Sequence, residues 1–126
     1  MGTRAAVITY VGGKRKFSNR KTWGGFPEEF GKQLCQMLTV IKCSKSFPKR
    51  AEHVYLRELD ELCAVREDVD SEHADVSYLY RVDLDRRIRV RIWTKSPTED
   101  YETTMGKRPL FEGDPTRVAQ NLMGLL

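Results

Sequence analysis

The stretch Val76–Trp93, VSYLYRVDLDRRIRVRIW, decides the fold class of this chain. Its even-numbered residues are apolar over 76–84 and again over 88–92, and they alternate with mostly polar residues. Alternation with a period of two is typical of a strand that buries one face. If the even-numbered residues of both runs face the same core, the loop between the runs must hold an odd number of residues, most simply Asp85–Arg87. The stretch therefore predicts an antiparallel hairpin with an apolar even-numbered face.

The odd-numbered face of this hairpin is basic, and it is the first candidate binding surface. The expected register puts Arg81 opposite Arg91, Asp83 opposite Arg89 and Leu79 opposite Trp93. Arginines spaced along a sheet beside an aromatic side chain could hold phosphates and stack a base. In the alternative interpretation the face is solvated, and Asp83 pairs with Arg89. Two opposed arginines cost stability unless an anionic group, or a helix that carries acids, lies across them. The candidate contact residues on this hairpin are Arg81, Arg87, Arg89, Arg91 and Trp93.

The N-terminal part of the chain predicts a second hairpin. Arg4–Val11, RAAVITYV, is almost continuously apolar, which is typical of a strand covered on both faces. Gly12 and Gly13 predict a turn into a weaker strand that extends to Trp23. The segment KRKFSNRK, residues 14–21, holds five cationic residues and no acid, so it could extend the basic surface. The alternative is an edge strand whose charges protect it against aggregation. The candidate contact residues in this segment are Lys14, Arg15, Lys16, Arg20 and Lys21.

Helical periodicity replaces this alternation elsewhere in the chain. Over residues 27–42 the apolar side chains follow the spacing of one core-facing helical stripe. A second helix is expected from about Ala51 to Val65, and Asp114 before Pro115 predicts the start of a third. Residues 95–113 are expected to be irregular.

The order of these elements, β-β-α-α-β-β-α, predicts the architecture. Residues 1–126 are too few for a second independent core, so we expect one domain. The predicted fold is α+β, with an antiparallel sheet of about four strands and two or three helices packed on one face.

Composition and charge exclude several classes of protein. A hydrophobic content of 40% and a charged content of 32% are those of an ordinary soluble protein, and no apolar run reaches the length of a membrane span. The net charge of +4 permits an anionic partner without requiring one. The three cysteines form no paired motif, so we expect reduced thiols and a cytoplasmic location.

Metal and catalytic motifs are absent from the sequence. The cysteines and histidines have none of the short paired spacings that zinc modules use. Residues 68–72 alternate acids as a calcium loop does, but His73 occupies the position of the required glycine and Leu79 that of the final acid. Neither a nucleophile elbow nor a phosphate-binding loop is present. We therefore expect no metal, no cofactor and no catalytic residue.

The nine residues WGGFPEEFG, Trp23–Gly31, join the second strand to the first helix. Arg4, Trp23 and Phe26 could line a small-ligand site there, and the alternative is a purely structural joint. Gly31 is informative, because a glycine inside a helix costs about 1 kcal/mol relative to alanine. It suggests either a close backbone approach to that turn or a binding site against it.

Three short motifs follow one another along the chain: MGTR at residues 1–4, TWGGFP at 22–27 with Gly31 and Leu34 after it, and ADVSYLYRVD at 74–83. This arrangement resembles a family of short phage and bacterial proteins that begin M-[GS]-T-R and continue with a (H)W-D-G-Y-P stretch and a D-x-E-Y-x-Y-x-V-D strand. The resemblance implies a small protein often carried by phages or mobile elements, and it implies no established activity. Thr22 and Gly24 stand where relatives often have His and Asp, which favours binding over catalysis in this chain.

Three functional hypotheses follow. In the first, a phage-type accessory protein binds a host protein complex in the host cytoplasm and inhibits defence or regulation, for example in an anti-CRISPR-like role. The second is direct nucleic-acid binding by the basic sheet face. The third is a small-ligand or enzymatic site near Trp23. None of the three involves a membrane, and the oligomeric state stays open.

Overall fold

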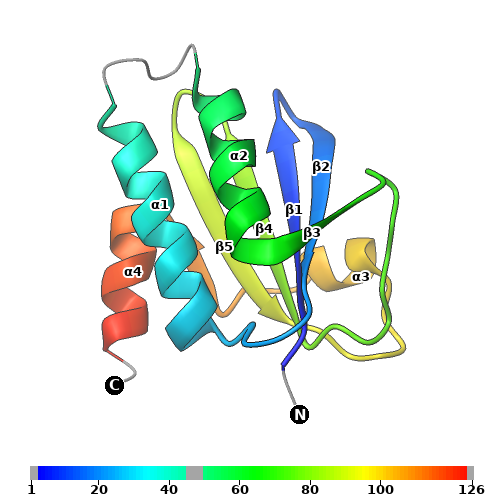
Figure 1. Cartoon of the computed structure of the whole chain (residues 1–126). Coiled ribbons are helices and arrows are strands. Elements are labelled where there is room, and N and C mark those ends of the chain that lie inside the picture. The colour runs from blue at the N-terminus through cyan, green and yellow to red at the C-terminus, as the bar shows by residue number, and fades with distance from the viewer. Residues whose placement is uncertain (1–2, 45–49, 125–126) are drawn as a thin grey trace.

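The computed structural model describes residues 3–44 and 50–124 of the chain. Most of these residues lie in one sheet and the helices around it (Figure 1). In chain order the elements are β1 (Ala5–Val11), β2 (Lys14–Lys21), the π-helix η1 (Pro27–Gly31), α1 (Lys32–Lys42), α2 (Ala51–Cys63), β3 (Ala64–Glu67), β4 (Tyr78–Leu84), β5 (Ile88–Thr94), α3 (Tyr101–Met105), β6 (Phe111–Gly113) and α4 (Pro115–Met123).

The hairpin predicted from residues 76–93 is confirmed, with its register. Strands β4 and β5 are antiparallel, and Leu84 lies opposite Ile88, so the turn is Asp85–Arg87. Arg81 lies opposite Arg91, as expected. The even-numbered side chains from Tyr80 to Ile92 in both strands are buried and Tyr78 is partly buried, because they face the helices, whereas Thr94 at the end of β5 is exposed.

The α+β class is confirmed, whereas the predicted four-stranded antiparallel sheet is only roughly matched. The sheet has six strands in the order β3-β2-β1-β4-β5-β6. The two hairpins meet through β1 and β4, which run parallel, with Ala5 opposite Tyr78. A parallel pair needs a long crossover connection, and the segment that holds α1 and α2 supplies it. The short strands β3 and β6 extend the sheet at its two edges.

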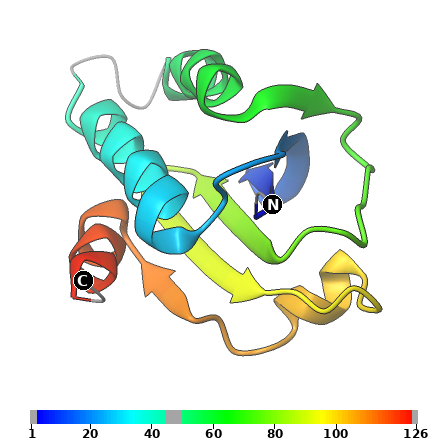
Figure 2. The ribbon, with the colours of Figure 1, turned by 60° about the horizontal axis from the view of Figure 1, so that its bottom comes forward.

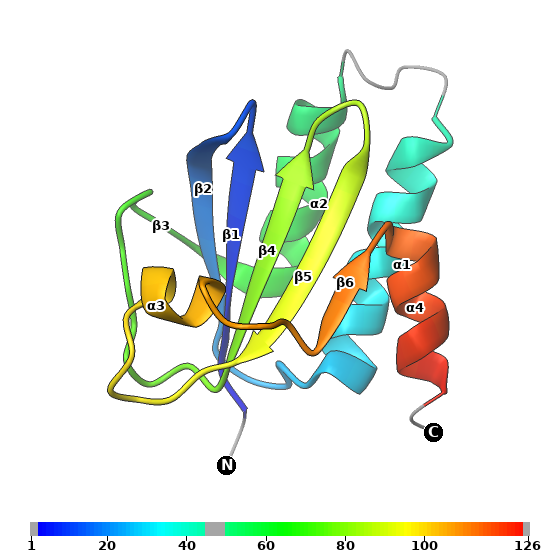
Figure 3. The same ribbon diagram turned by 180° about the vertical axis from the view of Figure 1, so that it is seen from behind.

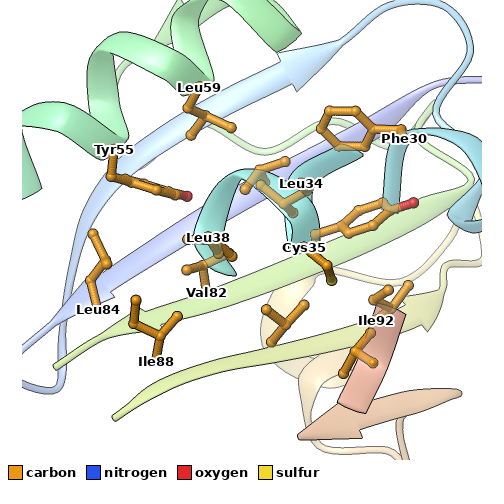
Figure 4. Packing of buried hydrophobic residues seen from close by; sticks show 14 of the residues in the cluster. Phe30, Leu34, Cys35, Leu38, Tyr55, Leu59, Val82, Leu84, Ile88 and Ile92 are labelled. Carbon is orange, nitrogen blue, oxygen red and sulfur yellow. The ribbon is translucent and has the colours of Figure 1, made fainter. Parts of the chain in front are cut away.

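The main core lies between one face of the sheet and the helices α1, α2 and α4 (Figure 4). Helix α1 lies between α2 and α4 on this face (Figure 2). Gly31, at the end of η1, packs closely against α4, because an added Cβ would lie 3.1 Å from Leu122 Cδ1. Other elements do approach this glycine closely, but through the side chains of Leu122, Ile92 and Tyr80 rather than through their backbone. The largest fully buried side chains of the cluster are Phe30, Leu34, Leu38, Tyr55, Leu59, Tyr80, Ile88, Ile92 and Leu122.

The expectation that helices cover only one face of the sheet was wrong. Helix α3 and the segments beside it cover part of the opposite face (Figure 3). A second apolar cluster lies under it and consists of Ala6, Ile8, Val76, Leu79, Trp93 and Tyr101. This cluster accounts for the almost continuous apolar character of β1, whose alternate residues belong to the two clusters.

Two further boundaries differ from the expectation. The second helix ends at Cys63, because Ala64 adopts a left-handed conformation with φ of 64° and the chain enters β3. Residues 95–113 are not wholly irregular, since they contain α3 and β6. Asp100 begins α3 as an N-cap, where its side chain accepts a hydrogen bond from the Thr103 amide at 2.7 Å.

A buried hydrogen bond fixes α2 on the sheet. The hydroxyl oxygens of Thr9 on β1 and Tyr55 on α2 lie 2.6 Å apart, and both residues are fully buried. We expect Tyr55→Phe to lower the free energy of unfolding by about 1–3 kcal/mol, because the Thr9 hydroxyl then loses its partner in an apolar environment. Urea unfolding measures this loss. The double variant Thr9→Val/Tyr55→Phe should cost less than the sum of its single variants, and strict additivity would contradict the coupling.

Candidate functional site

The arginines of the odd-numbered hairpin face are paired with acids of the same chain. The Arg81 guanidinium donates to both carboxylate oxygens of Asp83, at 3.0 and 3.1 Å, and lies 3.8 Å from the centroid of the Tyr10 ring. Arg91 Nε lies 3.2 Å from Glu112 Oε2, and an Arg89 nitrogen lies 3.6 Å from the same oxygen. Of the opposed pair Arg81 and Arg91, Arg81 is thus paired with Asp83 of its own strand, and Arg91 is paired with Glu112 of β6. Asp83 pairs with Arg81 rather than with Arg89.

Trp93 does not offer a stacking surface. The residue is only 3% exposed, and its indole Nε1 donates to the Lys107 carbonyl oxygen at 2.9 Å. Its ring belongs to the apolar cluster under α3. Trp93 is therefore not available to stack a base beside these arginines.

The cations of segment 14–21 are divided between the two faces of the sheet. On the α3 side, Arg20 Nε lies 3.1 Å from Glu67, and Arg15 donates to the Ser71 carbonyl oxygen at 2.6 Å. On the other side, Lys16 pairs with Glu52 of α2, and Lys21 donates to the Leu62 carbonyl oxygen. Lys14 is exposed at the start of β2. The segment therefore does not form one continuous basic surface with the hairpin arginines.

The joint Trp23–Gly31 is held by backbone contacts. The Gly25 amide donates to the Thr3 carbonyl oxygen at 2.8 Å, and the Gly25 carbonyl oxygen accepts a hydrogen bond from the buried Tyr80 hydroxyl at 2.9 Å. Trp23 is 72% exposed and Phe26 is 39% exposed, and the Phe26 and Tyr78 rings make a T-shaped contact.

Arg4, the third residue considered for a ligand site at this joint, pairs with Asp75 at 3.0 Å. None of Arg4, Trp23 and Phe26 lines either of the two hollows that are described below. The geometry of this region supports the structural joint.

Four cations without an ion pair among the described residues lie together at one end of the molecule. We call this the hairpin end: the turns at residues 12–13 and 85–87 together with the last turn of α1 (Figure 1). The two turns are tied together by a hydrogen bond of 2.9 Å from the Gly12 amide to Asp85 Oδ1. Within residues 3–44 and 50–124, the side chains of Lys14, Lys42, Arg86 and Arg87 make no ion pair.

A hollow of about 570 Å³ opens at the hairpin end. It exists because β6 ends at Gly113, opposite Val90, so the first two residues of β5 have no neighbouring strand on that side. The chain turns away there into α4, and α1 ends nearby at Lys42. The lining comprises Lys42, Arg86, Arg87, Ile88, Arg89 and Asp114.

The charge in this hollow favours an anionic ligand. Four cationic side chains and one carboxylate, that of Asp114, line it, and one of the cations, Arg89, also lies 3.6 Å from Glu112. Asp114 already accepts a hydrogen bond from the Arg117 amide at 3.0 Å as the N-cap of α4, where the helix dipole offsets its charge. The hollow therefore combines concavity with an uncompensated positive charge.

A second hollow of about 310 Å³ lies beside α3 and has mixed charge. Lys95 is almost buried there, and its ammonium group donates to the Ser96 carbonyl oxygen at 3.0 Å. Three carboxylates, those of Glu72, Glu99 and Asp100, share the lining with it. This balance does not select an anion.

The two buried cysteines of the described residues, Cys35 and Cys63, do not carry reactive thiolates, and Cys43 is exposed. Burial raises the pKa of Cys35 and of Cys63 to about 12, so both thiols stay protonated at neutral pH. Among residues 3–44 and 50–124, no group of three or more His, Cys, Asp or Glu side chains is placed to hold a metal. No helix in the same ranges is long and apolar enough to cross a membrane.

Of the predicted contact residues, only Arg87 and Arg89 line the hollow of about 570 Å³, which we call the basic hollow. Lys42 was missed, and Arg86 was recognised as a neighbour of the hairpin face but was not predicted as a contact. Arg86 lies in the same turn as Arg87, so its charge was visible in the sequence. Lys42 carries no such signal, because it lies on the exposed side of α1 and only the packing of α1 beside β5 brings it to the turn.

No family model matches the chain, and no curated protein or solved structure matches it significantly.

Proposed function

We propose that this chain is a phage-type accessory protein that binds a macromolecular complex of its host without catalysing a reaction, and thereby inhibits host defence or regulation. The observation that carries the binding role is the set of four unpaired cations at the hairpin end. The order of the MGTR, TWGGFP and ADVSYLYRVD motifs supports the phage-type part of the proposal.

The pairing of the other cations directs the proposal to this end of the molecule. A partner that engaged Arg81 or Arg91 would have to compete with Asp83 or Glu112. Arg86 and Arg87 are exposed and have no such competitor among the described residues. Contacts there form without the loss of an internal ion pair, and their strength falls as salt screens the exposed charges.

Reversing the charge of the β4–β5 turn tests this proposal. We expect Arg86→Glu/Arg87→Glu to weaken capture of the host complex on the order of tenfold or more, because like charges then face each other across the contact. The measurement is a pull-down from host lysate with tagged protein at low and moderate salt, followed by titration of the recovered complex.

A matched control removes the same number of positive charges elsewhere. Arg57 lies exposed on α2, and Arg108 lies exposed between α3 and β6, near the other end of β5. The variant Arg57→Glu/Arg108→Glu should retain the complex. Equal losses in the two double variants would show that only net charge matters, and equal retention would place the contact away from the hairpin end.

A further inference from the structure

The basic hollow is more selective than an exposed charged patch. A phosphate group offers several acceptor oxygens to guanidinium forks, and arginine matches this geometry better than lysine does. Three of the four cations that line the hollow are arginines, and two of these, Arg86 and Arg87, make no ion pair with a described residue, whereas Arg89 lies 3.6 Å from Glu112. Its volume lies within the range of pockets that hold small ligands or single groups of larger ones.

We infer that this hollow binds phosphate groups, and that the ligand which carries them is a nucleic-acid strand of the host complex. The inference rests on the proposed function and names the chemistry of its contact. Arg86 and Arg87 come from the β4–β5 turn, and Lys42 comes from the end of α1, so the cations converge on the hollow from two elements.

The shape of the hollow distinguishes this ligand from an acidic protein surface. A flat surface that carries carboxylates would meet the exposed tips of Arg86 and Arg87 but would leave the concave part unfilled. A backbone phosphate on a flexible strand can enter the concavity and reach Arg86, Arg87 and Lys42 together. Asp114 does not oppose this strongly, because the α4 N-terminus offsets its charge.

The arginine side chains that would contact phosphate can be replaced without the loss of a hydrogen bond or ion pair within the described part of the protein. Arg86 and Arg87 lie exposed in the turn and make no hydrogen bond or ion pair with another described residue, so neutral variants should keep the fold. Circular dichroism and thermal unfolding verify this before binding is measured.

The test is fluorescence anisotropy with the full chain and a short fluorescein-labelled single-stranded DNA, with a duplex of the same sequence beside it. We expect Arg86→Gln/Arg87→Gln to weaken binding of the single strand about tenfold or more, and Lys42→Gln to weaken it less. The slope of log affinity against log salt should fall by roughly one for each lost phosphate contact. The control Arg57→Gln/Arg108→Gln should leave both quantities unchanged.

Competition separates phosphate from other polyanions. Tripolyphosphate should displace the oligonucleotide, and polyglutamate at the same total charge should displace it poorly. Equal displacement by polyglutamate would overturn the inference, and so would the absence of oligonucleotide binding at low salt or equal losses in the two double variants.

The two proposals fail separately. If oligonucleotides do not bind, but a nuclease-treated lysate still yields a complex that Arg86→Glu/Arg87→Glu fails to capture, the phosphate inference is wrong and the proposed function stands. If neither measurement depends on the β4–β5 turn, both are wrong.

Discussion

Replacing Phe30 by alanine is expected to lower the free energy of unfolding by about 3–5 kcal/mol, the largest effect of any single truncation considered for this molecule. Phe30 lies in η1, is fully buried, and meets the Tyr80 ring edge to face at a centroid distance of 5.1 Å. Alanine would leave a cavity between this turn and the sheet. The neighbouring elements cannot close it readily, because Gly31 already places η1 in contact with Leu122 of α4.

Urea unfolding followed by circular dichroism measures the effect. Val40→Ala is the matched control, since Val40 lies on the following helix and is 73% exposed. That variant should change the free energy of unfolding by no more than about 0.5 kcal/mol. A loss below about 1 kcal/mol for Phe30→Ala would mean that η1 does not pack as described.

Substituting Gly25 by valine is the second change with a large expected effect. An added Cβ would lie 2.8 Å from Ala5 Cβ, and 3.1 Å from both the Ala5 amide nitrogen and the Thr3 carbonyl oxygen. Two of these three atoms belong to the backbone at the start of β1, which is paired on both sides and cannot move aside. We expect a loss of about 2–4 kcal/mol from this overpacking.

The cause of this effect is steric rather than conformational, because Gly25 is not among the glycines with positive φ. Gly106→Ala provides the comparison. Its added Cβ would lie 3.4 Å or more from the nearest atoms, so the variant should be neutral or more stable by a few tenths of a kcal/mol. Thermal unfolding of the two variants separates the cases, and a Gly25→Val protein as stable as the parent would refute the close packing of the joint.

The alternating pattern of residues 76–93 contained enough information to predict the hairpin and its register. A shift of the strand register by one residue would have moved the buried side chains to the opposite face of the sheet. The same pattern could not reveal that β4 pairs with β1. Neighbour choice depends on how α1 and α2 cross the sheet, and local alternation does not encode this. Strand β6 has only three residues, which is too short for a period of two to be recognised.

The missed strands also explain why the charges were misjudged. Glu112 lies on β6 and Glu67 on β3, and these two acids neutralise Arg91 and Arg20. Without those strands the basic face looked uncompensated. The hairpin end differs, because Arg86 and Arg87 lie beyond the last residue pair of β4 and β5, where no neighbouring strand supplies an acid.

The parallel pairing of β1 with β4 has a consequence for synthesis in the cell. Residues 5–11 leave the ribosome long before residues 78–84 have been translated. During that time the edge of β1 that will pair with β4 has no partner strand. Until then its backbone groups and the apolar side chains of both its faces are open to strands of other nascent chains. Both hairpins can form from local contacts, whereas the β1–β4 pair between them can form only after the long connecting segment has been ordered. The slowest step of folding is therefore expected to be the joining of two preformed halves.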